Sequence, residues 1–146
     1  MHSLLEQLAA AQWLVTSYLC GLIWTIQLVH YPSFEWIVAA QFEEFHRFHS
    51  RRITAIVMLP MVVELAVAIA LLQYEPLWFW AVNLGSVMAI WAVTFFISVP
   101  LHNRLQSGKN LQSIAKLVAT NWLRTALWSA RALWLLAGAL LFHVVF

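Results

Sequence analysis

Four of the six histidines of this chain are candidates for chemistry: His30, His46, His49 and His102. On a helix, Glu43, His46 and His49 follow one another at intervals of three residues and form one ridge. Imidazole nitrogens together with a carboxylate are ligands that suit iron, copper or zinc. The sequence therefore predicts a transition-metal site made by His30, Glu43, His46, His49 and His102.

Other uses of these side chains stay open. Glu43-x-x-His46 has the spacing found in carboxylate-bridged di-iron bundles, but those bundles use it twice and this chain has it once. A haem would need two histidines facing each other across a bundle, a role open to His30 and His102 but favoured by no other feature. The histidines could instead bond only to water or lipid headgroups, or serve acid–base chemistry or substrate binding without a metal.

The elements that carry these residues are expected to be membrane helices. The chain has 146 residues, of which 63% are hydrophobic and 10% charged, whereas soluble domains have roughly 25% charged residues. Helical periodicity extends the second and fourth of its four apolar segments beyond the membrane. Because lipid-exposed backbone must satisfy its own hydrogen bonds, we predict one all-α domain over residues 1–146, a four-transmembrane-helix bundle. Its helices are expected at about 8–30, 39–72, 77–101 and 111–145, with Pro32 ending the first.

Basic residues predict the orientation. Lysines and arginines occur in the links 31–52 and 102–117, and are absent from the two ends of the chain and from the link 73–76. The positive-inside rule then places both long links in the cytoplasm and both termini on the extracytoplasmic side. We expect an integral protein of the bacterial inner membrane, in contact with the lipid bilayer and with no nucleic-acid partner. A homo-oligomer and a larger membrane complex both stay open.

Charged residues within the apolar segments predict a buried ion pair. Glu64 lies thirteen residues beyond Arg51, and Arg131 lies fifteen beyond Lys116. At about 1.5 Å per residue, both side chains are roughly 20 Å deep. Either charge alone would cost ~2.5–3.5 kcal/mol or more at mid-membrane, so we predict that Glu64 and Arg131 pair. Whether this pair serves packing or also contacts a substrate stays open.

The end of the third helix and the start of the fourth carry a recognisable pattern, made by Val99-Pro100-Leu101-His102-Asn103-Arg104-Leu105, Leu117-Val118 and Asn121-Trp122-Leu123-Arg124-Thr125. This pattern resembles the anthrone-oxygenase-like family of small four-helix membrane proteins. The resemblance implies that Asn103, Asn121 and Arg124 share a catalytic polar site. It also implies oxidation of tricyclic anthrones to anthraquinones with molecular oxygen. The added histidines of the first half favour a subgroup with altered, metal-dependent chemistry.

Three functions are compatible with these residues. The first is an oxidoreductase or oxygenase for a hydrophobic aromatic or quinone-like small molecule, in which the histidines hold a metal or relay protons while Asn121 and Arg124 orient an oxyanion. The second is a non-catalytic accessory or cofactor-binding subunit of a larger membrane complex. The third is a small transporter or channel with Glu64 and Arg131 along its path, which we rank last because no inverted repeat is evident.

Overall fold

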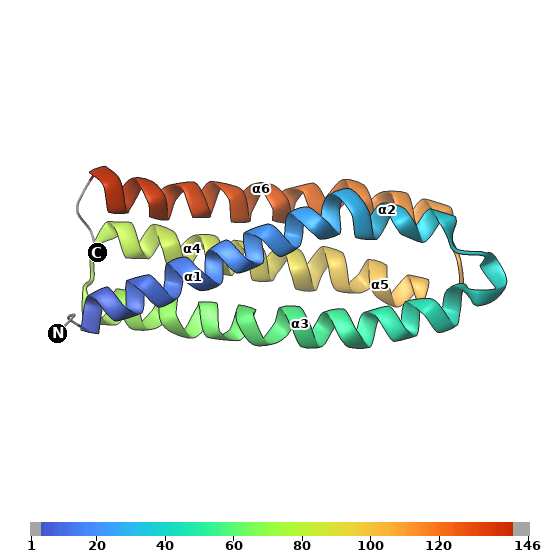
Figure 1. The fold of residues 1–146 in the computed structure, drawn as a ribbon, viewed down its shortest axis with the longest axis horizontal. Coiled ribbons are helices and arrows are strands. Elements are labelled where there is room, and N and C mark those ends of the chain that lie inside the picture. Colours follow the sequence, from blue (N-terminus) through green and yellow to red (C-terminus); the bar gives the residue numbers. More distant parts are fainter. Residues whose placement is uncertain (1–3, 142–146) are drawn as a thin grey trace.

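The computed structural model describes residues 4–141, and this part of the chain is almost entirely helical (Figure 1). It forms four long helices, two of which are composed of several segments. The first consists of α1 (Leu4–Thr25), η1 (Ile26–His30), α2 (Tyr31–Ser33) and η2 (Phe34–Trp36), and the second is α3 (Ala39–Tyr74). The third consists of α4 (Trp78–Val93), η3 (Thr94–Ser98) and α5 (Val99–Leu105), and the fourth is α6 (Leu111–Leu141).

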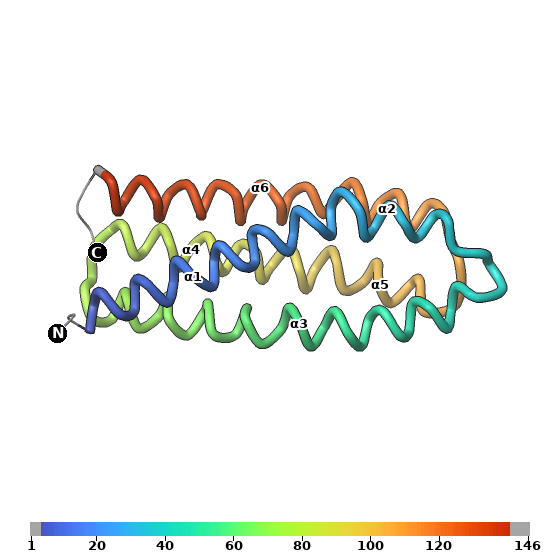
Figure 2. Tube along the Cα trace, in the orientation of Figure 1, coloured from blue at the N-terminus to red at the C-terminus, as the bar shows by residue number. Residues whose placement is uncertain are grey.

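The four helices alternate in direction and form a bundle, as Figures 1 and 2 show. Both α1 and α4 pack against α3 and α6. The α2–α3 and α5–α6 links lie together at one end, which we call the histidine end, and the α3–α4 link lies at the other. The expected starts at 39 and 111 agree with the structure, and the expected end at 145 lies outside the described residues.

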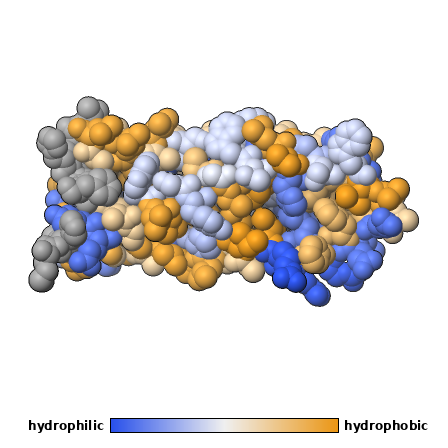
Figure 3. Space-filling model, in the orientation of Figure 1, coloured by the Kyte–Doolittle hydropathy of each residue, from blue (hydrophilic) through white to orange (hydrophobic). Residues whose placement is uncertain are grey.

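Three of the helices are long and apolar enough to cross a membrane: Leu4–Trp36, Ala39–Tyr74 and Trp78–Leu105. In Figure 3, strongly hydrophilic residues gather toward the histidine end, where the first half of α3 exposes its arginines. α6 runs beside the other helices, but Arg124 and Arg131 lower the hydropathy of its described part. That α6 crosses the membrane, and that the termini face outward, stay predictions.

The first helix continues through Pro32, and our expectation that it ends there is wrong. A proline cannot donate a hydrogen bond to the carbonyl four residues earlier and clashes with it. Here the preceding turn, η1, is a π-helix in which the Tyr31 N–H donates to the carbonyl of Ile26, five residues back. The third helix uses the same solution before Pro100, where η3 is also a π-helix. π turns of this kind are frequent at functional sites, and both lie next to the histidine end.

The two links at the histidine end are tied to each other. The Lys109 Nζ donates hydrogen bonds to the carbonyls of Glu35 and Ile37, each at 2.8 Å. Gly108, which has a φ of 125°, forms the turn, and the Asn110 side chain accepts a hydrogen bond from the Ser113 N–H at 2.8 Å to cap α6. These contacts fix the entry to α6 relative to the α2–α3 link.

Close packing at the opposite end predicts that Gly138→Ala destabilises the bundle. A Cβ at Gly138 would overlap the ring of Phe79, which is buried and stacks on Trp134 with ring centroids 5.1 Å apart. We expect a loss of about 1–3 kcal/mol in the free energy of unfolding. Denaturation in detergent micelles, followed by circular dichroism, measures this loss.

Gly85→Ala is the matched control, because a Cβ at this helical glycine would meet no neighbouring atom. Alanine is favoured over glycine in a helix by up to about 1 kcal/mol, so this variant should be neutral or more stable. If both variants behave alike, the contact between Gly138 and Phe79 is not a tight one.

Candidate functional site

Four histidines from three of the long helices converge at the histidine end. His30 ends η1, His46 and His49 lie one turn apart on α3, and His102 lies on α5. The His30 Nε2 lies 2.5 Å from the His49 Nδ1, and the His46 Nε2 lies 3.2 Å from the His102 Nδ1. The imidazoles therefore meet as two pairs of ring nitrogens.

The two pairs belong to one cluster. The ring of His49 lies 6.2 Å from that of His46 and 5.8 Å from that of His102, measured between centroids. Tyr31 extends the cluster, because its hydroxyl lies 2.9 Å from the His102 Nε2. His46 and His49 are almost completely buried, with 0% and 4% of their surface exposed. We call His30, His46, His49, His102 and Tyr31 the histidine cluster.

Two ring nitrogens of the histidine cluster are buried without a hydrogen-bond partner, the His46 Nδ1 and the His49 Nε2. Each nitrogen of a neutral imidazole is either a donor or an acceptor, so both of these atoms are unsatisfied whichever tautomer is present. Such a group costs about 1–3 kcal/mol in a protein interior. The cluster therefore has the capacity to bind a further atom at each of these two positions.

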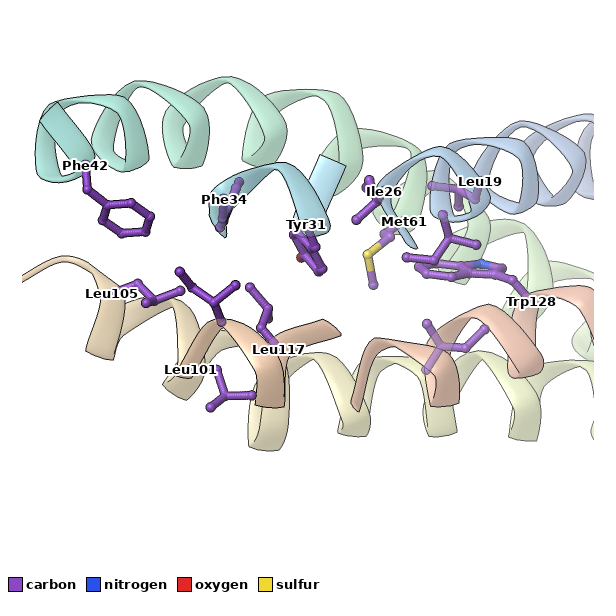
Figure 4. Close-up of a cluster of buried hydrophobic side chains, with 13 residues drawn as sticks. Leu19, Ile26, Tyr31, Phe34, Phe42, Met61, Leu101, Leu105, Leu117 and Trp128 are labelled. Carbon is purple, nitrogen blue, oxygen red and sulfur yellow. The ribbon is translucent and has the colours of Figure 1, made fainter. Parts of the chain in front are cut away.

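Phenylalanines enclose the histidine cluster. Phe34 is fully buried and its ring contacts those of His30, His46 and His49, with centroids 5.6, 5.9 and 5.0 Å apart. Phe42 stacks on His46 at 5.8 Å. In Figure 4, Phe34 and Phe42 lie at the same end of the apolar core as Leu105 and Leu117. This apolar shell strengthens electrostatic interactions among the imidazoles by excluding water.

A polar relay leads from the histidine cluster toward the middle of the bundle. The Asn121 Nδ2 donates to the Gln27 Oε1 at 2.9 Å, and the Asn121 Oδ1 accepts from the Arg124 Nη1 at 3.3 Å. The guanidinium of Arg124 lies beside the Tyr31 phenol and over the ring of Trp128, 5.3 Å from its centroid. Asn121 therefore positions Arg124 next to the cluster.

Arg124 is a buried cation without an acidic partner. Only 4% of its surface is exposed, and its Nε has no hydrogen-bond partner. No carboxylate within residues 4–141 forms an ion pair with it. A buried charge is costly unless it is paired or hydrogen-bonded, so Arg124 is well placed to bind an oxygen atom of a ligand.

The structure brings the predicted partners Glu64 and Arg131 together as a fully buried ion pair. Thr16 and the Trp128 indole N–H also donate to the Glu64 carboxylate, at 3.2 and 3.4 Å. On its other side, the Arg131 Nε donates to the Asn83 Oδ1 at 3.0 Å. All four long helices therefore contribute to one polar network.

Two residues expected at the site lie elsewhere. Glu43 is exposed and its carboxylate lies 3.9 Å from the Arg47 guanidinium, because Phe42 occupies the inward-facing position of that turn. Asn103 is also exposed and accepts a hydrogen bond from Gln106 at 3.2 Å. The structure therefore brings together the four predicted histidines and the Asn121–Arg124 pair, without Glu43 and Asn103.

The arrangement of the described side chains is not that of a preformed metal site. Across residues 4–141, no group of three or more histidine, cysteine, aspartate or glutamate side chains has a geometry that could hold a metal ion. Two imidazole nitrogens on one tetrahedral ion lie roughly 3.3 Å apart, because metal–nitrogen bonds are about 2.0–2.1 Å long. The 3.2 Å separation of the His46–His102 pair fits this value, whereas the 2.5 Å separation of the His30–His49 pair must open.

Tyr31 and Phe34 lie at the site, but neither was among the site residues predicted from the sequence. Tyr31 continues the polar stripe of the first helix, four residues beyond Gln27, and this spacing was the available signal. Phe34 follows the proline at which we expected the helix to end. Its contacts with the rings of the histidines could therefore not be predicted. Comparison with known proteins gives no further guidance, because no family model, curated protein or solved structure matches the chain.

The buried ion pair predicts that a single substitution destabilises the protein more than the double substitution does. Arg131→Met leaves the Glu64 carboxylate buried without its cation, and we expect a loss of about 3–5 kcal/mol in the free energy of unfolding. Adding Glu64→Met removes the stranded charge and should recover most of that loss. Denaturation of the two variants in the same detergent gives the comparison.

Arg47→Met serves as the control, since its ion pair with Glu43 is exposed and should contribute little. Equal losses for the single and the double variant would mean that side-chain shape, rather than charge pairing, matters at this position.

Proposed function

We propose that this protein is a membrane-embedded oxidoreductase that binds a transition metal at the histidine cluster and acts on a hydrophobic aromatic or quinone-like molecule. The observation that carries the proposal is the convergence of four imidazoles from three helices, with two of their buried nitrogens unpartnered. The resemblance to the anthrone-oxygenase-like family supports the reaction class and stays a prediction.

The donor set fits a redox metal. Neutral imidazoles suit iron and copper as well as zinc, and the first two exchange electrons. His30, His46, His49 and His102 would be the ligands, and the contact between Tyr31 and His102 would hold one imidazole in place from outside. Bound metal would supply single-electron transfer between substrate and oxidant. The enclosing phenylalanines would keep bulk water away from that chemistry.

The residues beside the cluster suit a substrate that loses protons as it is oxidised. With molecular oxygen as the oxidant, two hydroquinones release four electrons and four protons, which reduce one O2 to two waters. In each hydroquinone both O–H bonds break and a quinone forms. Arg124 would bind the substrate oxygen as it loses its proton, and the Tyr31 phenol, whose oxygen contacts the His102 imidazole, would lie beside that oxygen. The protons released would end on the O2 that is reduced to water.

Metal binding is tested by substituting the buried histidines. Outer-shell partners of metal ligands are worth 10–100-fold in affinity, so His46→Ala and His49→Ala should each weaken binding by more than about 100-fold. Elemental analysis of the purified protein and titration of metal-free protein with Co2+ measure this effect. Affinity should also fall as the pH is lowered, because metal and proton compete for the same nitrogen.

Glu43→Gln is the matched control, because it lies on the same turn of α3 but is exposed. It should retain full metal content. A wild-type protein that binds no metal, or a His46→Ala His49→Ala variant that binds as well as the wild type, would contradict the proposed metal site.

We also propose that the histidine end faces the cytoplasm, which the arginine-rich half of α3 favours. In a Cys20→Ser background, Ser107→Cys lies in the α5–α6 link and Gln73→Cys at the opposite end of the bundle. A membrane-impermeant maleimide should label Gln73→Cys in intact bacterial spheroplasts and Ser107→Cys only after lysis. The reverse pattern would overturn this orientation.

A further inference from the structure

A pocket of about 100 Å3 opens on the side of the bundle between α3 and the η3–α5 segment. α3 packs closely on α4 but much less on α5, which leaves this gap. Thr54 of α3 and Val99 of α5 are exposed at its mouth, and both lie in helices that are long and apolar enough to cross a membrane. The pocket therefore opens sideways from the bundle rather than at its end.

The inner end of the pocket combines an apolar floor with three polar groups. Ile26 and Met61 are buried there. Tyr31, His102 and Arg124 also line the pocket, so it reaches the histidine cluster. Since the Arg124 Nε is buried without a partner, this pocket offers a cation and an imidazole–phenol pair to whatever enters it.

We infer that this lateral pocket binds the single aromatic ring of a hydroquinone whose hydrophobic tail stays in the lipid bilayer. This inference names the substrate class of the proposed oxidoreductase, and it rests on that proposed function. A cavity of about 150 Å3 holds one benzene molecule, so a pocket of about 100 Å3 that is open on one side suits a single ring better than three fused rings. The tricyclic substrate implied by the family resemblance is larger than this pocket and would extend out of it.

The lining of the pocket suits both the apolar face of a hydroquinone ring and its polar oxygen atoms. Met58 and Met61 place thioethers along the pocket, and methionine sulfur packs well against aromatic rings. Arg124 provides a charged donor for a ring oxygen, and the Tyr31 phenol, which contacts the His102 imidazole, is a second polar group for that oxygen. From His102 the contact with His46 continues into the histidine cluster at 3.2 Å. The ring would thus lie next to the cluster while its tail passes between Thr54 and Val99.

The test is saturation binding of tritium-labelled decylhydroquinone to the full-length protein in lipid nanodiscs, with protein-free nanodiscs subtracted. Unlabelled decylhydroquinone should displace the probe, whereas decylbenzene, which lacks the ring oxygens, and anthrone, which has three rings, should not. Arg124→Gln should weaken binding about tenfold, the usual effect of losing a charged hydrogen-bond donor. Thr54→Trp should obstruct the mouth and also lower the affinity, without altering the buried core.

Ile56→Trp is the matched control, since it introduces the same side chain at an exposed position of α3 away from the pocket, and it should bind like the wild type. Displacement by decylbenzene or anthrone as strong as that by decylhydroquinone, or equal binding by Thr54→Trp and Ile56→Trp, would overturn the inference. Metal content is measured on the same samples. Metal without saturable probe binding overturns the pocket assignment alone, whereas saturable probe binding without metal overturns the proposed function and supports the pocket.

Discussion

The buried ion pair between Glu64 and Arg131 sets the register of the whole bundle. Two opposite charges in an apolar interior are tolerated only when they meet, and separating them is strongly unfavourable. With Thr16 on α1 and Asn83 on α4 bonded to the pair, no helix can slide by a residue without breaking a buried polar contact. The histidines of α3 lie fifteen and eighteen residues from Glu64, roughly 25 Å along the helix. The ion pair in the middle of the bundle therefore fixes the position of these histidines along the bundle axis.

The polar interior follows from the apolar exterior. Few polar side chains are available, and those inside the helices would be costly against lipid, so each helix turns its polar stripe toward the others. The inward face of α3 carries His46, His49 and Glu64 together with the apolar Phe42 and Met61, all buried at helical spacing. Periodicity alone was therefore sufficient to predict that His46 and Glu64 face the same way, and Pro60 does not interrupt the helix between them.

Two features could not be predicted from the sequence: the rotation of each helix about its own axis, and the π turns within the first and third helices. Glu43 follows Phe42 by one residue, and about 100° of rotation takes it from the interior to the surface. The same step separates Asn103 from His102. Only the packing partner of each helix decides which of two adjacent residues faces inward, and one sequence does not contain that information. The π turns before Pro32 and Pro100 were hidden for a related reason, because a proline is compatible both with the end of a helix and with a locally widened one.

The two π turns have a consequence for how this site could arise. A π turn accommodates one residue more than the α-helical turn it replaces. Deleting a single codon within residues 26–30 or 94–98 would restore regular winding and rotate everything beyond it by about 100°. His30, Tyr31 and the buried Phe34, or His102 with the buried Leu101 and Leu105, would then turn away from their present neighbours. The extra residue in each of these two helices therefore decides which side chains beyond it face the histidines of α3.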